Sequence, residues 1–197
     1  MANTQATFGF RQIGYISGAG VDYQLNTGTI LSSNATKIFR GDPVCLDPTT
    51  GAVVQGANNT SSLLGVFDGC MYTPTTGGPP QWSPFWPGAA FGPATAYFID
   101  APNAMFMAAC LNTAIVTANL GENVGFAIGT GNTVTGVSGA TADQSTLNTT
   151  NTLPFKVWKM ANDFLPAGSQ GADLTSAYAW VVVTFNNVRS KQLTGLA

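Results

Sequence analysis

Acidic side chains are the first candidates for chemistry in this sequence. The chain has 197 residues, of which nine are Asp or Glu and none is His. Asp42 and Asp47 form a close pair in the sequence, and two neighbouring carboxylates could support acid–base catalysis or bind calcium. Both stand next to a proline, in segments where Asp is favoured because its side chain bonds to the local backbone. We therefore expect both to be turn residues.

Other catalytic and cofactor motifs are missing from the sequence. Without histidine, the chain lacks Ser-His-Asp and Cys-His arrangements and the commonest metal ligand. Cys45, Cys70 and Cys110 are odd in number and have no zinc spacing, so we expect small buried thiols in a reducing cytoplasm. The Gly129-Thr-Gly131 segment has no third glycine for a dinucleotide loop. We predict no enzyme activity, no metal and no cofactor.

Composition narrows the possible partners. Charged residues make up 8% of the chain, against about 25% in ordinary soluble domains. The seven Lys and Arg form no basic run, which argues against nucleic-acid binding. No apolar run approaches the ~20 residues of a membrane helix. So few charges predict a surface that partners cover, although Thr, Asn, Ser and Gly could also solvate it.

Short strands and tight turns must position these residues. Residues 44–46 and 52–55 flank an Asp-Pro-Thr-Thr-Gly segment, which predicts a β-hairpin. Residues 95–100 and 104–110 predict a second hairpin around an Asp/Pro turn. Residues 178–185 are apolar on both faces and predict a central strand. The expected fold class is all-β, with short antiparallel strands in a partly closed barrel or sandwich.

An aromatic loop interrupts this pattern at residues 73–94, where Pro and Gly are frequent. Proline removes donors from a β-ladder, so a central strand is not expected here. Trp82, Phe85 and Trp86 need burial, and three interpretations are open. The rings cover the chain's own core, dock on a neighbouring chain, or form a sugar-stacking platform. For Trp86, which lies between two prolines, we favour docking.

The N-terminal part differs from the rest. Residues 1–36 are polar and glycine-rich, show no helical period and contain aromatics such as Phe8 and Phe10. We expect an extended N-terminal arm, with short strands, that becomes ordered on a neighbour. Residues 37–197 are expected to form a single β-rich domain that includes the aromatic, Pro-rich loop at 73–94.

Several segments, taken in order, resemble the capsid decoration proteins of tailed bacteriophages, also called cement or head-stabilising proteins. Each motif is weak alone, but together they extend over nearly the whole chain. The segments are Phe8-Gly-Phe-Arg11, Arg40-Gly-Asp-Pro-Val44, Leu64-Gly-Val66, 95–110, 126–140, 153–163 and 177–186. The sequence departs from the family in its longer aromatic loop and in the Ala and Met residues that replace charges in the predicted second hairpin.

The resemblance implies a structural virion protein, made in the cytoplasm of the bacterial host. It would bind the outer surface of the capsid and stabilise the head against the pressure of packaged DNA. Its partners would be the major capsid protein and neighbouring copies, with a trimer favoured and a dimer possible. The alternative is a carbohydrate- or receptor-binding β module of a virion fibre. The candidate partner-binding residues are Phe8, Phe10, Arg11, Trp82, Phe85 and Trp86.

Overall fold

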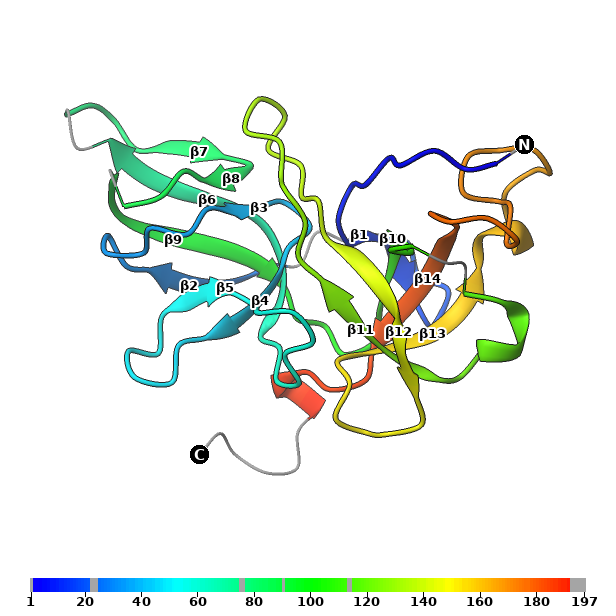
Figure 1. Ribbon diagram of the computed structural model, residues 1–197. Coiled ribbons are helices and arrows are strands. Elements are labelled where there is room, and N and C mark those ends of the chain that lie inside the picture. Colours follow the sequence, from blue (N-terminus) through cyan, green and yellow to red (C-terminus); the bar gives the residue numbers. More distant parts are fainter. Residues whose placement is uncertain (1, 22–24, 75–76, 90, 113–114, 192–197) are drawn as a thin grey trace.

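The computed structural model describes residues 2–21, 25–74, 77–89, 91–112 and 115–191. Within these ranges the chain forms fourteen strands and three single-turn 3₁₀ helices, so the fold is all-β as expected (Figure 1). The helices are η1 (Thr117–Asn119), η2 (Ala161–Asp163) and η3 (Arg189–Lys191). None of the helices in the described part of the chain is long and apolar enough to cross a membrane.

One six-stranded antiparallel sheet, here called sheet A, forms the right half of Figure 1. Its central position is filled by a Trp-Val-Val-Val-Thr-Phe strand, whose β-branched and aromatic side chains suit a pleated surface covered on both sides. In spatial order the strands are β1 (Arg11–Tyr15), β10 (Ala104–Ala109), β14 (Trp180–Phe185), β13 (Phe155–Met160), β11 (Asn123–Ala127) and β12 (Thr141–Asn148).

A second sheet, sheet B, forms the left half, and a two-stranded ribbon lies beside it (Figure 1). The main strands of sheet B are β2 (Asn26–Ile30), β9 (Phe91–Ile99), β6 (Gly65–Pro74), β4 (Pro43–Leu46) and β5 (Val53–Gln55), and β7 (Gln81–Ser83) pairs with β6. The ribbon pairs β3 (Ile38–Phe39) with β8 (Phe85–Trp86).

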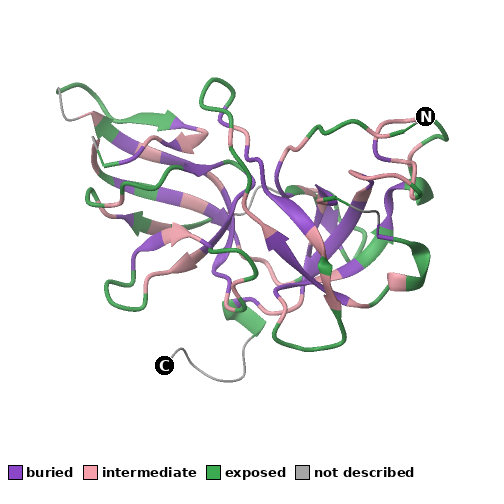
Figure 2. Cartoon of the chain, in the orientation of Figure 1, coloured by how far each residue is buried: buried purple, intermediate pink, exposed green. Residues whose placement is uncertain are grey.

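Two hydrophobic clusters hold the molecule together, one associated mainly with each sheet. In the first, Phe10 stacks on Phe155 with ring centroids 4.4 Å apart. In the second, Trp86 is fully buried, and its ring packs edge-on against the ring of Tyr72 with centroids 6.0 Å apart. Buried residues accordingly run through the strands of both halves (Figure 2). The sheets do not close into a barrel, and the arrangement is sandwich-like.

The first predicted hairpin is confirmed. β4 and β5 pair with Cys45 opposite Val54, and Asp47 accepts bonds from the backbone N–H groups of Thr49 and Thr50 at 2.9 and 2.8 Å. Gly51 closes the turn at a φ of +68°, a region that glycine adopts without steric cost. The prediction of a central strand is also confirmed, because β14 lies between β10 and β13.

The second predicted hairpin is wrong, although both of its strands exist. β9 pairs with β2 and β6 in sheet B, whereas β10 pairs with β1 and β14 in sheet A. The Asp/Pro turn between them is a corner at which the chain passes from one sheet to the other. An alternating pattern around a turn predicts two strands, but it does not show that they pair with each other.

Residues 1–36 contain the expected short strands, and the aromatic loop is more regular than expected. The N-terminal segment supplies one short strand to each sheet, β1 and β2. The loop at 73–94 is shortened by β6 and β9, which extend into it, and it contains β7 and β8. The expectation that no central strand lies in this segment is wrong at its end, because β9 begins at Phe91, includes Pro93 and lies between β2 and β6. Among the described strands, β7 pairs only with β6 and β8 pairs only with β3.

Candidate functional site

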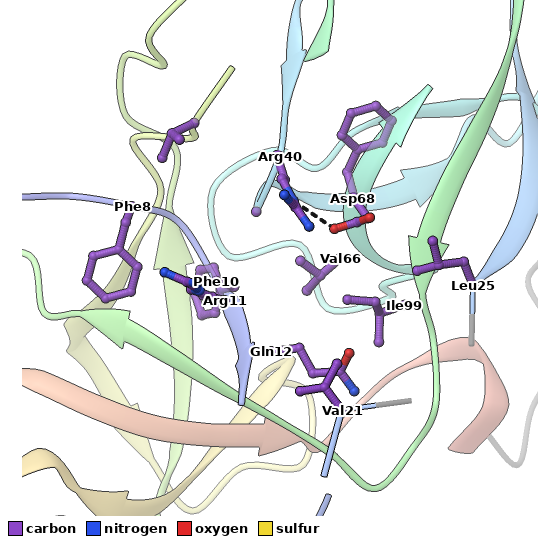
Figure 3. Close-up of a pocket in the computed structure, with 13 residues that line it drawn as sticks. Phe8, Phe10, Arg11, Gln12, Val21, Leu25, Arg40, Val66, Asp68 and Ile99 are labelled. Atoms are coloured by element: carbon purple, nitrogen blue, oxygen red, sulfur yellow. Dashed lines mark hydrogen bonds and ion pairs between the residues drawn. The ribbon is translucent and has the colours of Figure 1, made fainter. Parts of the chain in front are cut away.

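A cleft of about 420 Å³ lies between the two sheets and is the candidate functional site (Figure 3). It brings together three predicted partner-binding residues from the N-terminal segment with residues from the turn that precedes β4 and from sheet B. The residues that matter below are Phe8, Phe10, Arg11, Gln12, Arg40, Val66, Asp68 and Ile99. Because both halves contribute, the cleft exists only when the sheets hold their mutual position.

Two glycines place the N-terminal segment along this cleft. Gly9 has a φ of +71° and Gly41 a φ of +95°, values that favour glycine. A Cβ on Gly9 would lie 2.8 Å from the carbonyl oxygen of Gly41, which is too close for any other residue. This close approach allows the Phe10 N–H to donate to the Gly41 carbonyl at 2.9 Å. Phe10 is then anchored in the core beside the cleft.

Three charged residues among those that the structure describes line the cleft, namely Arg11, Arg40 and Asp68. Arg40 Nε donates to Asp68 Oδ1 at 2.8 Å, with the Arg40 side chain 50% exposed. Arg11 is also exposed, and within the described part of the chain no acceptor contacts its guanidinium. The Gln12 side chain is half-buried, and its buried Nε2 atom has no hydrogen-bond partner. The cleft therefore combines hydrogen-bond donors with an apolar floor.

The two aspartates first considered for catalysis have structural roles. Asp42 is fully buried, where Phe39 N–H donates to its Oδ2 at 2.8 Å and Ser138 Oγ donates to its Oδ1 at 2.5 Å. Burial raises the pKa of Asp42 above the ordinary value, although its hydrogen bonds partly oppose this shift. Asp47 is exposed, and hydrogen bonds from Thr50 and Thr49 lower the pKa of its carboxyl group. Both are turn residues, as expected.

Possible metal ligands are dispersed among the described residues, and the thiols lie in surroundings that raise their pKa. No group of three or more His, Cys, Asp or Glu residues among those described could hold a metal ion. All three cysteines are free thiols. Burial raises the pKa of Cys70 to about 12 and that of Cys110 to about 11, and it is also the main reason that the pKa of Cys45 is raised. Such thiols are protonated at neutral pH and are poor nucleophiles.

The three aromatic residues of the loop do not share a surface. Trp86 is fully buried and its Nε1 donates to the Asn34 carbonyl at 3.0 Å, so our preference for docking through Trp86 is wrong. Phe85 is half-buried and stacks on Phe39 with ring centroids 5.5 Å apart. Trp82 is 51% exposed. These rings therefore do not form the sugar platform that the fibre-module alternative would use.

Other exposed apolar side chains were not singled out by the sequence analysis. Val134 is 92% exposed in a loop where Asn132 Oδ1 accepts a bond from its N–H at 2.8 Å. Trp158 is 39% exposed, at a register shift between Val157 and Lys159. Such an irregularity can turn a side chain outward. Side chains alternate between the two faces of β13, so Trp158 points away from the face on which Val157 is buried. This alternation in the sequence could have identified Trp158 as exposed.

Among its described residues, the cleft presents charged, polar and apolar side chains that could bind a ligand. Its polar side chains act as hydrogen-bond donors or are engaged in structural bonds. Comparison with protein-family models, with curated proteins and with solved structures finds no match for this chain.

Proposed function

We propose that this chain is a structural virion protein that binds the outer surface of a tailed-phage capsid and stabilises the head against internal DNA pressure. Its partners in this proposal are the major capsid protein and neighbouring copies of itself. The ordered series of sequence motifs is the origin of the proposal, and the distribution of exposed apolar side chains is the structural observation that supports it.

Exposed large apolar side chains lie on both halves of the molecule. Trp82 projects from β7 beside sheet B, whereas Trp158 lies on β13 of sheet A and Phe164 follows η2. β7 and β13 stand well apart, on the left and right of Figure 1. A protein that ties neighbouring capsid units together needs separated contact surfaces, and this distribution provides them.

The mechanism that follows is geometric. Each copy would make several modest contacts, and repetition of these contacts around a closed oligomer and across the lattice would raise the total affinity by avidity. A surface with few charges suits this role because charged groups are costly to bury at an interface. A trimer on the particle is favoured and a dimer is the second choice.

Residues 2–8, the first part of the N-terminal segment, suit the role of a strap. They lie on the surface and are held mainly through polar contacts. Asn3 Nδ2 donates to the Asp173 carbonyl at 2.8 Å, and Gln170 Nε2 donates to the Thr4 carbonyl at 2.7 Å. Exchange of such bonds with those of a neighbouring subunit would cost little net free energy.

A pelleting assay tests this function. Capsids assembled from the major capsid protein encoded in the same phage genome are mixed with the purified chain and sedimented. We expect saturable co-sedimentation with a fixed ratio of chain to capsid subunit. Recovery of the chain only in the supernatant, at concentrations that exceed the capsid subunits, would contradict the proposal.

A further inference from the structure

We infer that residues 170–176, here called the receiving loop, are a recognition site for Asn3-Thr4, here called the docking segment, and that copies lying side by side exchange their docking segments. The inference deepens the proposed strap, because it names the surface of the neighbour that receives it. It rests on the proposed function only for the close packing of copies. Within one chain the blue N-terminal end already lies beside the orange receiving loop (Figure 1).

The side chain of Asn3 is recognised by backbone groups of the receiving loop. Its Nδ2 donates to the Asp173 carbonyl at 2.8 Å, and its Oδ1 accepts a bond from the Gly171 N–H at 3.0 Å. The N–H of Asn3 also donates to Ser176 Oγ at 3.1 Å. Asn and Gln are the side chains whose planar amide carries both an NH₂ donor and a carbonyl acceptor. The loop therefore selects an amide side chain at this position.

Gln170 binds the second residue of the docking segment. Its Oε1 accepts bonds from the Thr4 N–H at 3.2 Å and from Thr4 Oγ1 at 3.1 Å. Its Nε2 donates to the Thr4 carbonyl at 2.7 Å. The Gln170 amide thus pairs with both backbone groups of Thr4, much as a neighbouring strand would. The receiving loop reads a backbone as well as a side chain, which is how an extended segment is recognised.

The chain between the docking segment and the core is suited to such an exchange. Residues 4–6 are exposed, and within the described part of the chain no bond to another backbone group fixes residues 5–9. The first firm contacts follow at Phe8, whose ring packs on Trp180, and at Phe10 in the core. The docking segment can therefore leave its own loop without breaking a β-ladder or exposing either ring.

The reach of the strap limits where the neighbour lies. Fully extended, the five residue steps from Asn3 to Phe8 span at most roughly 18 Å. The receiving loop is itself close to Phe8, because the Trp180 N–H donates to the Gly171 carbonyl at 2.8 Å. Exchange thus requires that copies meet near the start of β14, with their receiving loops facing one another.

The occupant that fits best is a second copy of this chain. Exchange replaces each bond within a chain by the same bond between chains, so the number of hydrogen bonds is conserved. Exchange of an identical element is a low-cost route to a closed oligomer. Residues 2–8 carry no charged side chain, so their approach to a neighbour meets little electrostatic resistance. Any other protein would have to supply an Asn side chain and an extended backbone in the same arrangement.

Nuclear magnetic resonance of mixed full-length chains tests this inference. Isotope-labelled Asn3→Ala keeps its receiving loop but deprives the Gly171 N–H of its acceptor, so the Gly171 resonance should move from its position in the natural chain. Unlabelled Gln170→Ala keeps Asn3 but loses three bonds to Thr4, which frees its docking segment. We expect added Gln170→Ala to return the Gly171 resonance of the labelled chain saturably, with half of the effect below about 1 mM.

The double variant Asn3→Ala/Gln170→Ala is the matched control, because its segment is freed in the same way but carries no Asn3 amide. It should leave the labelled Gly171 resonance where it is. No return with Gln170→Ala at about 1 mM, an equal return with the double variant, or an unmoved resonance in Asn3→Ala alone would each overturn the inference. Because no capsid is present, the exchange can fail while capsid attachment persists, and attachment can fail while the exchange persists.

Discussion

Ser138 Oγ donates a hydrogen bond of 2.5 Å to Asp42 Oδ1, and this contact joins positions 96 residues apart in the sequence. Both residues are buried. Asp42 Oδ2 accepts further bonds from Phe39 N–H at 2.8 Å and from Gln55 Nε2 at 2.7 Å, and Ser138 Oγ accepts one from Ala140 N–H at 2.8 Å. The pair thus fastens the segment before β12 of sheet A to the turn that precedes β4 of sheet B.

Loss of this contact should destabilise the fold. We expect Ser138→Ala to lower the free energy of unfolding by about 1–3 kcal/mol, because a buried carboxylate loses a donor and Ala140 loses an acceptor. Ser145→Ala is the matched control, since Ser145 also donates to an aspartate, Asp143, at 2.5 Å but lies exposed. Urea denaturation measures the free energy of unfolding of both variants. Equal losses would show that burial of the Ser138–Asp42 pair adds nothing to stability.

Asp42 should also give the stability a distinct pH dependence. Burial raises its pKa in the folded state above the ordinary 3.8, so the folded chain holds the proton more tightly than the unfolded chain. The resulting stabilisation is complete below about pH 3.8 and is lost as the pH rises through the folded pKa. Asp42→Asn cannot titrate and removes this component while the other acids still titrate.

We therefore expect the free energy of unfolding of the natural chain to fall, relative to that of Asp42→Asn, as the pH rises from the ordinary value of 3.8 through the raised pKa of folded Asp42. Denaturation curves of both proteins across this range supply the measurement. A difference that stays constant, or one that grows in favour of the natural chain, would show that burial does not raise the pKa of Asp42.

The two tryptophans of the aromatic loop should respond oppositely to truncation. Trp86→Ala should cost the isolated chain about 3–5 kcal/mol, as expected for a large buried side chain. Trp82→Ala should cost about 1 kcal/mol or less because half of the ring is exposed, yet we expect it to weaken capsid attachment. Thermal unfolding and co-sedimentation distinguish the two. Unchanged attachment of Trp82→Ala would remove Trp82 from the contact surface.

Local turn chemistry explains which features the sequence predicts well. The hairpin of β4 and β5 follows from Asp47 and Gly51, whose preferred conformations depend only on their immediate neighbours. Pairing between strands that are distant in the sequence could not be predicted in this way. The burial of Trp86 depends on β3, whose Ile38 lies opposite it in the ribbon, and nothing within the loop specifies that partner.

The candidate site could likewise be predicted only in part from the sequence. Phe8, Phe10 and Arg11 were selected as one motif, and the structure places all three at the cleft. Arg40 and Asp68 join them only because sheet B packs beside sheet A, which no local pattern indicates. The unpartnered amide of Gln12 likewise becomes visible only when its surroundings are known.

Truncation of the N-terminal segment should separate attachment from folding. Removal of residues 1–7 keeps Phe8 and Phe10. The ring centroid of Phe8 lies 5.0 Å from that of Trp180, and Phe10 stacks on Phe155. We expect this variant to fold with a nearly unchanged melting temperature and to attach poorly to capsids. Removal of residues 1–12 should cost about 3 kcal/mol or more, because the buried Phe10 ring is lost. Full attachment of the shorter truncation would exclude a strap at residues 2–8.

An electron cryo-microscopy map of capsids incubated with the purified chain tests the central claim most directly. The account predicts density for the chain on the outer capsid surface, at symmetry-equivalent positions, with copies meeting around threefold axes or, as the second choice, in pairs. Isolated copies that touch only capsid protein would contradict the predicted oligomer. Bare capsids at saturating concentrations of the chain would contradict the capsid-binding function itself.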